Sequence, residues 1–360
     1  MDRPDSETIS QAATVAARSR DTRRATMKQV AALAGVSLST VSRVVNEDPA
    51  VRADLVERVR HAVDALGYRH NATASALRRN DGLSASIGVI VEDVANPFFS
   101  AVQRGIEDVA RERGVLTFAG SSDELAGRER LLAEAFGARG VDGLIIAPAG
   151  SDHGYLLRDR EAGMALVFVD RPGCFIDADA VLTDNFGGAA AAVDHLVAAG
   201  HRRIGFLGDR PSLYTAGERL RGFEAALVRN AIALDPALVR HTATRAADAY
   251  ETTRELLLGH DPPTAIFTSQ NLITIDAVRA IHDLGRARST ALVGFDDVVL
   301  GDVLEPGLTV LGQDPAALGR AAAELLFSRL DGFDGPSRRV VLAPTLIARG
   351  SGELAPADTP

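Results

Sequence analysis

Short runs of β-branched residues alternate with longer helical patterns from Ala85 onward, and this alternation restricts the possible fold more than any other feature. We expect strands at 86–91, 115–118, 143–146 and 166–169, separated by helices at 97–113, 124–139 and 152–163. The alternation restarts after Asp184 with a helix at 186–199 and strands at 204–207, 265–267 and 291–295. Such a rhythm is typical of parallel sheets covered by helices on both faces. It predicts an α/β protein with two doubly wound lobes and a ligand in the cleft between them, at the carboxyl ends of the strands.

A different pattern precedes the lobes, where residues 27–46 read as two short helices around a sharp turn. Thr26 and Gln29 form a capping box, Gly35 ends the first helix, and Ser37 caps the second. Apolar residues at helical spacing face inward: Val30, Ala31, Leu33 and Ala34 on the first helix, and Val41, Val44 and Val45 on the second. The outward face carries Leu38, Ser39, Thr40, Ser42, Arg43 and Asn46. Short hydroxyls with an arginine suit DNA phosphates and base edges. An ordinary hairpin with a solvated face is the alternative, which the lack of Glu and Lys disfavours.

A third helix carries Leu55, Val59, Ala62, Val63 and Leu66 on one face and ends at Gly67, so three helices can close a small core. The segment 71–79 has Leu77 as its one large apolar residue and is too short to hold a helix alone in water. It is either a linker or a segment that becomes helical on DNA. Residues 1–25 read as a disordered tail.

Charge separates a small basic module from a large acidic one. The chain has 360 residues and a net charge of −9, but residues 26–80 hold eight basic and five acidic side chains. Only the basic module, residues 26–80, needs to contact DNA phosphate groups. Cys174 is the single cysteine, which excludes an internal disulfide and a cysteine-cluster metal site. We find no secretory signal and no run long enough to span a bilayer, and we expect a cytoplasmic protein without membrane contact.

The sequence resembles the lactose-repressor/galactose-repressor family of bacterial transcription regulators over essentially all of residues 26–350. The motifs that carry the resemblance occur in the family's order: residues 30–37, 40–44, 66–68, 96–99, 141–143, 170–171, 183–185, 200–204, 219–223, 263–267 and 294–297. The resemblance implies a helix-turn-helix domain with a hinge helix, followed by two lobes of the periplasmic-binding-protein type. The expected divisions are a tail (1–25), the DNA-binding domain (26–70), the hinge (71–82), the two-lobed effector-binding and dimerisation domain (83–350) and a second tail (351–360).

The resemblance also implies a homodimer that binds a near-palindromic operator in double-stranded DNA, as a regulator and repressor of a metabolic operon. A small sugar-like effector in the cleft would change operator affinity, and no cofactor or metal is implied. Leu38, Ser39 and Arg43 match base-reading positions. The remaining positions expected to contact DNA are Lys28, Ser37, Thr40, Ser42, Asn46, Asn71, Leu77 and Arg78, with Leu77 as the leucine that wedges into the minor groove. Positions expected to contact effector are Asp93, Phe98, Phe99, Asp170, Arg171, Arg219, Asn271 and Asp296.

Several of these residues have a purely structural alternative. We expect one of Phe98 and Phe99 to be core, Asp170 can cap a turn, and Arg219 can pair with Asp296 across the cleft.

The chain also departs from the family in three places. His70 stands where the family usually has Pro, Gln270-Asn271 replaces an Asn-Asp pair, and residues 244–247 lack the aromatic that some relatives use to stack a purine. The missing carboxylate removes a partner for a sugar hydroxyl, and the missing aromatic argues against a nucleobase as effector.

Two rival classes can be weighed against a regulator. An exported sugar-binding protein shares the two-lobed fold, but it needs a signal peptide and lacks a helix-turn-helix. An enzyme would need a phosphate loop, a nucleophile elbow or a His pair at metal-ligand spacing, none of which we find. His195 and His201 flank a helix end, and we expect both at the surface. The sequence therefore predicts a regulator and no enzyme.

Overall fold

The computed structural model describes residues 25–45, 48–68, 84–242 and 246–356. The chain divides into two compact units, Met1–Gly82 and Leu83–Pro360. The expected tail at 1–24, Asn46 and the expected hinge with Asn71, Leu77 and Arg78 lie outside the described residues.

The first unit contains the three expected helices, α2 (Met27–Ala34), α3 (Leu38–Val45) and α4 (Ala53–Leu66). The capping box at Thr26 is present, and Gly35 takes the left-handed conformation that ends α2, with φ of 62°. Val30, Val41 and Val59 are fully buried at the centre of the small core. Two leucines assigned to the inward faces are instead exposed, Leu33 by 55% and Leu66 by 36%. A core this small is filled by valines and alanines, which leaves the larger side chains at its edge.

The first lobe of the second unit is a six-stranded sheet in which every neighbouring pair is parallel. Its strand order is β11-β5-β4-β3-β1-β2. The strands are β1 (Ser86–Val91), β2 (Leu116–Ser121), β3 (Gly143–Ile146), β4 (Ala165–Val169), β5 (Asp179–Thr183) and β11 (Arg339–Leu342). Its helices are α6 (Pro97–Glu112), α7 (Ala126–Gly137), α8 (Leu157–Glu161, after a 3₁₀ turn at Gly154–Leu156) and α13 (Pro315–Leu330).

The second lobe repeats this plan with the order β12-β10-β9-β8-β6-β7, and only β12 is antiparallel to its neighbour. The strands are β6 (Ile204–Gly208), β7 (Val239–His241), β8 (Ala265–Thr268), β9 (Ala291–Phe295), β10 (Thr309–Gly312) and β12 (Thr345–Ile347). The helices are α9 (Asn185–Ala198), α10 (Tyr214–Arg229), α11 (Ala246–Leu258) and α12 (Asn271–Asp283), with 3₁₀ turns at Pro236–Leu238 and Gly301–Val303. The expected α/β class with two parallel-sheet lobes is thus confirmed.

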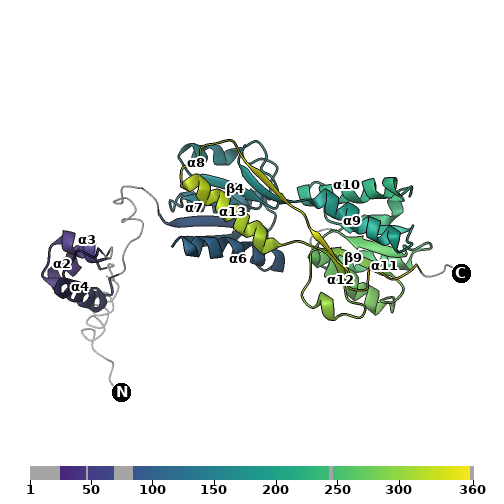
Figure 1. The fold of residues 1–360 in the computed structure, drawn as a ribbon, viewed down its shortest axis with the longest axis horizontal. Coiled ribbons are helices and arrows are strands. Elements are labelled where there is room, and N and C mark those ends of the chain that lie inside the picture. The colour runs from purple at the N-terminus through teal and green to yellow at the C-terminus, as the bar shows by residue number, and fades with distance from the viewer. Residues whose placement is uncertain (1–24, 46–47, 69–83, 243–245, 357–360) are drawn as a thin grey trace, which may run out of the picture. The chain divides into compact units, whose positions relative to one another are not determined.

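The chain passes between the lobes three times, not only near 184 as the restart of the pattern suggested. It leaves the first sheet after β5, returns after β10 to form α13 and β11, and leaves again to form β12 (Figure 1). Periodicity shows which face of an element is buried, but not which sheet it joins.

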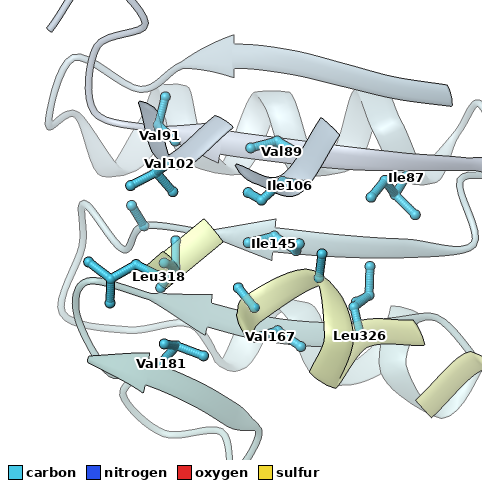
Figure 2. Close-up of a cluster of buried hydrophobic side chains, with 14 of the residues drawn as sticks. Ile87, Val89, Val91, Val102, Ile106, Ile145, Val167, Val181, Leu318 and Leu326 are labelled. Carbon is cyan, nitrogen blue, oxygen red and sulfur yellow. The ribbon is translucent and has the colours of Figure 1, made fainter. Parts of the chain in front are cut away.

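The helix α13 completes the core of the first lobe. Leu318 and Leu326 of α13 lie against apolar side chains of the central strands and of α6 (Figure 2). The two helices approach closely because Gly105 and Gly319 face the contact. A Cβ on Gly105 would lie 2.2 Å from the carbonyl oxygen of Ala316, and one on Gly319 would lie 2.0 Å from that of Val102.

Residues 351–356 belong to the second lobe, although they were expected to form part of a tail. Ser351 is buried and donates a 2.6 Å hydrogen bond to the carbonyl oxygen of Leu292. His201 is also a correction, because it is fully buried. Its ring nitrogens lie 2.9 Å from Thr264 Oγ1 and 2.8 Å from the carbonyl oxygen of Leu354. Both partners come from segments far away along the chain, so a local sequence pattern does not reveal them.

None of the helices in the described ranges is both long and apolar enough to cross a membrane.

Candidate functional site

The helix α3 presents a short polar face. Ser37 caps the helix, with its Oγ 3.1 Å from the Thr40 backbone nitrogen, 2.8 Å from Thr40 Oγ1 and 2.7 Å from Ser39 Oγ. Leu38 is 42% exposed at the start of the helix. The face therefore offers hydroxyl groups and one apolar side chain, a combination that can contact phosphates, base edges and thymine methyl groups.

Arg43 projects from the same face and binds Asp48 in the free protein. Its Nε lies 2.8 Å from Asp48 Oδ2, and this hydrogen bond lowers the pKa of the Asp48 carboxyl. The guanidinium is about half exposed, at 53%. An ion pair this open to water is weak, so a stronger partner can displace Asp48.

The second unit contains a polar cavity between its two lobes. It encloses about 470 Å³ of empty volume, including open solvent. Its charged residues follow strands of both sheets: Glu92 after β1, Asp170-Arg171 after β4, Asp209 after β6 and Asp296 after β9. The cavity thus lies at the carboxyl ends of the strands, as the alternating pattern predicted.

Arg219 of α10 lines this cavity and is almost fully buried. Its Nε donates to Asn185 Oδ1 at 2.7 Å, and its Nη1 donates to the carbonyl oxygen of Ser269 at 2.6 Å. The guanidinium also stacks over Phe295 at 3.7 Å from the ring centroid and lies 3.9 Å from Asp296 Oδ2. Burial lowers the pKa of Arg219. Arg219 and Asp296 are therefore paired, as expected, and both side chains also line the cavity.

Arg171 is the centre of a second network. Its Nη2 donates to Glu124 Oε1 at 2.7 Å and to Glu92 Oε2 at 3.3 Å, and its Nη1 donates to the carbonyl oxygen of Pro148. Glu124 also accepts from Arg210 of the other lobe at 2.9 Å. Burial opposes ionisation of Arg171, but the acidic neighbours outweigh it and raise its pKa. The network joins the two lobes at the edge of the cavity.

The carboxyl groups of the cavity are poorly compensated. Burial raises the pKa of Asp170, Asp209 and Asp296, and burial followed by the charge of Glu124 raises the pKa of Glu92 to about 8. The Asp170 carboxylate accepts no hydrogen bond from any residue in the described ranges, and its closest cation is Arg171 Nε at 3.5 Å. When ionised, these groups accept hydrogen bonds from the hydroxyl or amino groups of a ligand.

Comparison with known proteins identifies the family to which the chain belongs. A model of the bacterial regulatory proteins of the lacI family matches residues 26–71, and a periplasmic binding protein-like domain matches residues 193–352. The HTH-type transcriptional regulator PtxS of Pseudomonas aeruginosa is 34% identical, and the alignment covers 91% of this chain and 96% of that protein. The chain belongs to the lacI family of bacterial regulatory proteins.

This regulator also resembles solved structures of the family along most of its length. The Lac repressor dimer bound to operator and the anti-inducer ONPF is 28% identical with a TM-score of 0.79, covering 92% of this chain and 100% of that one. A LacI family regulator from Enterococcus faecium with bound ribose is 27% identical with a TM-score of 0.68, covering 76% and 100%. The resemblance predicted from the motifs is therefore confirmed, and the protein is an HTH-type, DNA-binding transcriptional regulator.

The regulator's cavity brings together most of the residues expected to contact effector. Those that line it are Phe98, Phe99, Asp170, Arg171, Arg219, Asn271 and Asp296. As expected, one phenylalanine is core, because Phe99 is 3% exposed and packs among the apolar residues of the first lobe. Asn271 reaches across the lobes and donates to Asn96 Oδ1 at 2.7 Å.

Asp93 is the exception and is not among the residues that line the cavity. Its Oδ1 accepts a 2.8 Å hydrogen bond from the backbone nitrogen of Ala95 in the turn before α6. Its neighbour Glu92, the first residue after β1, lines the cavity instead. One step along an extended chain reverses the direction of a side chain, so the choice between the two acids depends on where β1 ends.

Sequence reasoning missed further polar residues of the cavity. These are Glu92, Asn96, Asp209, Thr215, Ser269, Gln270 and Gln313. Glu92, Asp209 and Ser269 each directly follow a strand, and this position was the signal that could have identified them. Gln313 follows β10, a strand that the local pattern did not indicate.

Proposed function

We propose that this regulator binds a near-palindromic operator as a homodimer through α3, and that a sugar-like effector bound between the lobes controls operator affinity as in an effector-responsive repressor. The single observation that carries the proposal is the cavity at the strand ends, in which carboxylates and buried guanidinium groups surround a space beside Phe98. Carboxylates accept hydrogen bonds from sugar hydroxyls, and an aromatic side chain covers the apolar face of a sugar ring. The ribose-bound family member and the operator-bound Lac repressor dimer support the same assignment.

The DNA-reading part of the proposal assigns Leu38, Ser39 and Arg43 to base contacts. Ser37, Thr40, Ser42, Lys28 and Asn46 are assigned to the DNA backbone. An arginine that donates two hydrogen bonds to guanine contributes about 1–3 kcal/mol of discrimination. We therefore expect Arg43→Ala to weaken binding to the specific operator far more than binding to random DNA.

A matched control is Arg52→Ala, which removes an equal charge from a residue outside α3 that is paired with Asp54. We expect this control to leave the ratio of specific to random binding unchanged. Fluorescence anisotropy with operator and scrambled duplexes measures both ratios. An equal loss on both duplexes in Arg43→Ala would refute the assignment of Arg43.

The segment beyond the DNA-binding domain enters the proposal from the family resemblance alone. We assign Asn71 and Arg78 to the DNA backbone and Leu77 to the minor groove, where a wedging side chain kinks the duplex. Leu77→Ala should retain the dimer and effector binding but lose most operator affinity and the DNA bend, as measured by gel-phasing of a circularly permuted operator. If Leu77→Ala binds and bends the operator like the parent, this segment is only a linker between the domains.

The effector part is tested at Asp296. Asp296→Asn keeps the shape of the side chain and an acceptor for the amide of Gln313, but removes the charge that faces Arg219. We expect operator binding to persist and the response to a sugar panel to disappear. Loss of the melting transition of the second unit would instead indicate that Asp296 has a structural role.

We further propose that the effector is bound without turnover and released unchanged. Chromatography of a bound sugar after prolonged incubation tests this point, and any conversion above a protein-free control would contradict it.

A further inference from the structure

Glu92 and Asp209 enter the same cavity from opposite lobes. Each is the first residue after a central strand of its sheet, Glu92 after β1 and Asp209 after β6. The ionised form of each carboxyl is disfavoured here, because burial and then the charge of Glu124 raise the pKa of Glu92 to about 8, and burial raises the pKa of Asp209. A positive charge placed between the two carboxyls would offset this cost and allow both of them to ionise.

The neighbouring arginines do not provide this neutralisation, since Glu124 holds them. Arg171 and Arg210 donate to the two oxygens of Glu124 at 2.7 and 2.9 Å. Glu92 is left with a single 3.3 Å contact from Arg171. Asp209 accepts from the backbone nitrogen of Arg210, while the guanidinium of Arg210 stays 3.9 Å away.

The charge balance of the whole site points the same way. Around the cavity and its edge, five carboxyl groups (Glu92, Glu124, Asp170, Asp209 and Asp296) face three guanidinium groups (Arg171, Arg210 and Arg219). Buried carboxylates without a cationic partner are costly, and a positively charged ligand removes that cost.

Two unpartnered polar atoms show that the cavity is built for a polar ligand. Ser269 lines the cavity and is 1% exposed, yet its Oγ has no hydrogen-bond partner. The Nε of Arg171 is also buried there without a hydrogen-bond acceptor. Buried polar groups normally find a partner, so these atoms indicate that a ligand supplies one. In the described part of the chain, no group of His, Cys, Asp and Glu is placed to hold a metal ion.

We propose that the effector carries a protonated amino group that lies between Glu92 and Asp209, which makes an amino sugar the class of ligand that this cavity selects. The inference rests on the proposed effector site and deepens it. The remaining hydroxyls of such a ligand would donate to Asp170 and Asp296. Because the ammonium group attracts one carboxylate from each lobe, binding favours the closed arrangement of the lobes over the open one.

The experiment compares matched sugars that differ in charge. D-Glucosamine, D-galactosamine and D-mannosamine are each titrated into the full-length protein by calorimetry at neutral pH, beside the neutral parent hexose and its aldonic acid. We expect at least one amino sugar to bind about tenfold more tightly than its neutral parent, the effect of one additional charge-assisted contact. The aldonic acids should bind more weakly than the neutral hexoses.

Three variants locate the selective groups. Glu92→Gln and Asp209→Asn should each reduce the advantage of the amino sugar over its neutral parent to about twofold or less. Asp93→Asn is the matched control, because it removes the adjacent carboxylate that does not line the cavity, and the advantage should persist. Operator binding by the same preparations verifies that each variant is folded.

The proposal is overturned if no amino sugar binds, if the neutral or acidic member of every series binds more tightly, or if the advantage survives in both Glu92→Gln and Asp209→Asn. Binding by a neutral or acidic sugar alone would overturn the ammonium site and leave the proposed effector site standing. Failure of the unmodified protein to recognise an operator would count against the proposed function and not against this inference.

Discussion

Asp179 of the first lobe binds the segment that returns from the second lobe, which contains α13 and β11. It begins β5 and is fully buried, and arginines on either side of the α13–β11 connection bind its carboxylate. Arg329 donates from Nη2 at 2.7 Å and from Nε at 3.0 Å. Arg338 donates from Nη2 at 2.6 Å and from its backbone nitrogen at 2.7 Å. We predict that Asp179→Asn strongly destabilises the second unit.

The magnitude follows from the pKa of Asp179. Burial opposes ionisation of the carboxyl, but the hydrogen bonds from Arg329 and Arg338 outweigh it and lower the pKa from 3.8 to about 2. That difference corresponds to about 2 kcal/mol of unfolding free energy at neutral pH. Since the folded-state pKa is the lower one, this contribution is present above pH 3.8 and is lost as pH falls through about 2. The uncharged amide also leaves two arginines without their counter-ion, so we expect a total loss of about 3 kcal/mol.

Urea unfolding of the second unit, followed by circular dichroism, measures the difference between the parent and Asp179→Asn. At pH 7 the ionic contribution is complete, and at pH 3 only about half of it remains, so the difference should shrink on acidification. The matched control is Asp297→Asn. Asp297 accepts two hydrogen bonds from Arg349, at 2.6 and 2.7 Å, but its carboxylate is 42% exposed. A pair open to water should cost at most about 1 kcal/mol when broken.

Two results would refute this reasoning. One is a loss in Asp179→Asn no larger than that in Asp297→Asn, which would mean that burial adds nothing to the pair. The other is a parent–variant difference that stays the same from pH 7 to pH 3, which would mean that the carboxylate charge does not carry the stabilisation.

Three further predictions test other parts of the molecule. Burial lowers the pKa of His201 below its usual 6.5. As pH falls below 6.5, the unfolded chain therefore takes up a proton before the folded protein does, and stability is lost; urea titrations from about pH 7.5 to about 5.5 should show a steeper fall for the parent than for His201→Gln. Gly105→Ala would place a Cβ 2.2 Å from the carbonyl oxygen of Ala316 and should cost about 1–3 kcal/mol in the same assay. Gly127→Ala, where a Cβ meets nothing within 4 Å, should change stability by less than about 1 kcal/mol. Arg58→Ala removes hydrogen bonds of 2.6 and 3.1 Å to carbonyl oxygens at the end of α2, and it should cost about 1 kcal/mol and accelerate amide hydrogen exchange in that helix.

Local signals in the sequence determined much of the fold because their physical basis lies within a few residues. The capping box at Thr26 and the left-handed Gly35 need only the backbone beside them, and both occur as expected. The strands 143–146 and 291–295 coincide with their expected bounds, since a continuous apolar run bounded by polar residues is buried whatever its neighbours are. The motifs that resemble the lacI family likewise placed Asp170, Arg219 and Asp296 at the cavity.

Tertiary structure alone decided which groups meet across long separations. The return of α13 and β11 to the first lobe depends on Asp179 and on the close contact at Gly105, which join residues more than a hundred positions apart. The choice of Glu92 over Asp93 depends on the residue at which β1 ends, and only the folded cavity brings Glu92 and Asp209 together from opposite lobes. Patterns along a chain report the burial of each face, whereas the pairing of charges across a cleft depends on how two separately folded sheets close on each other.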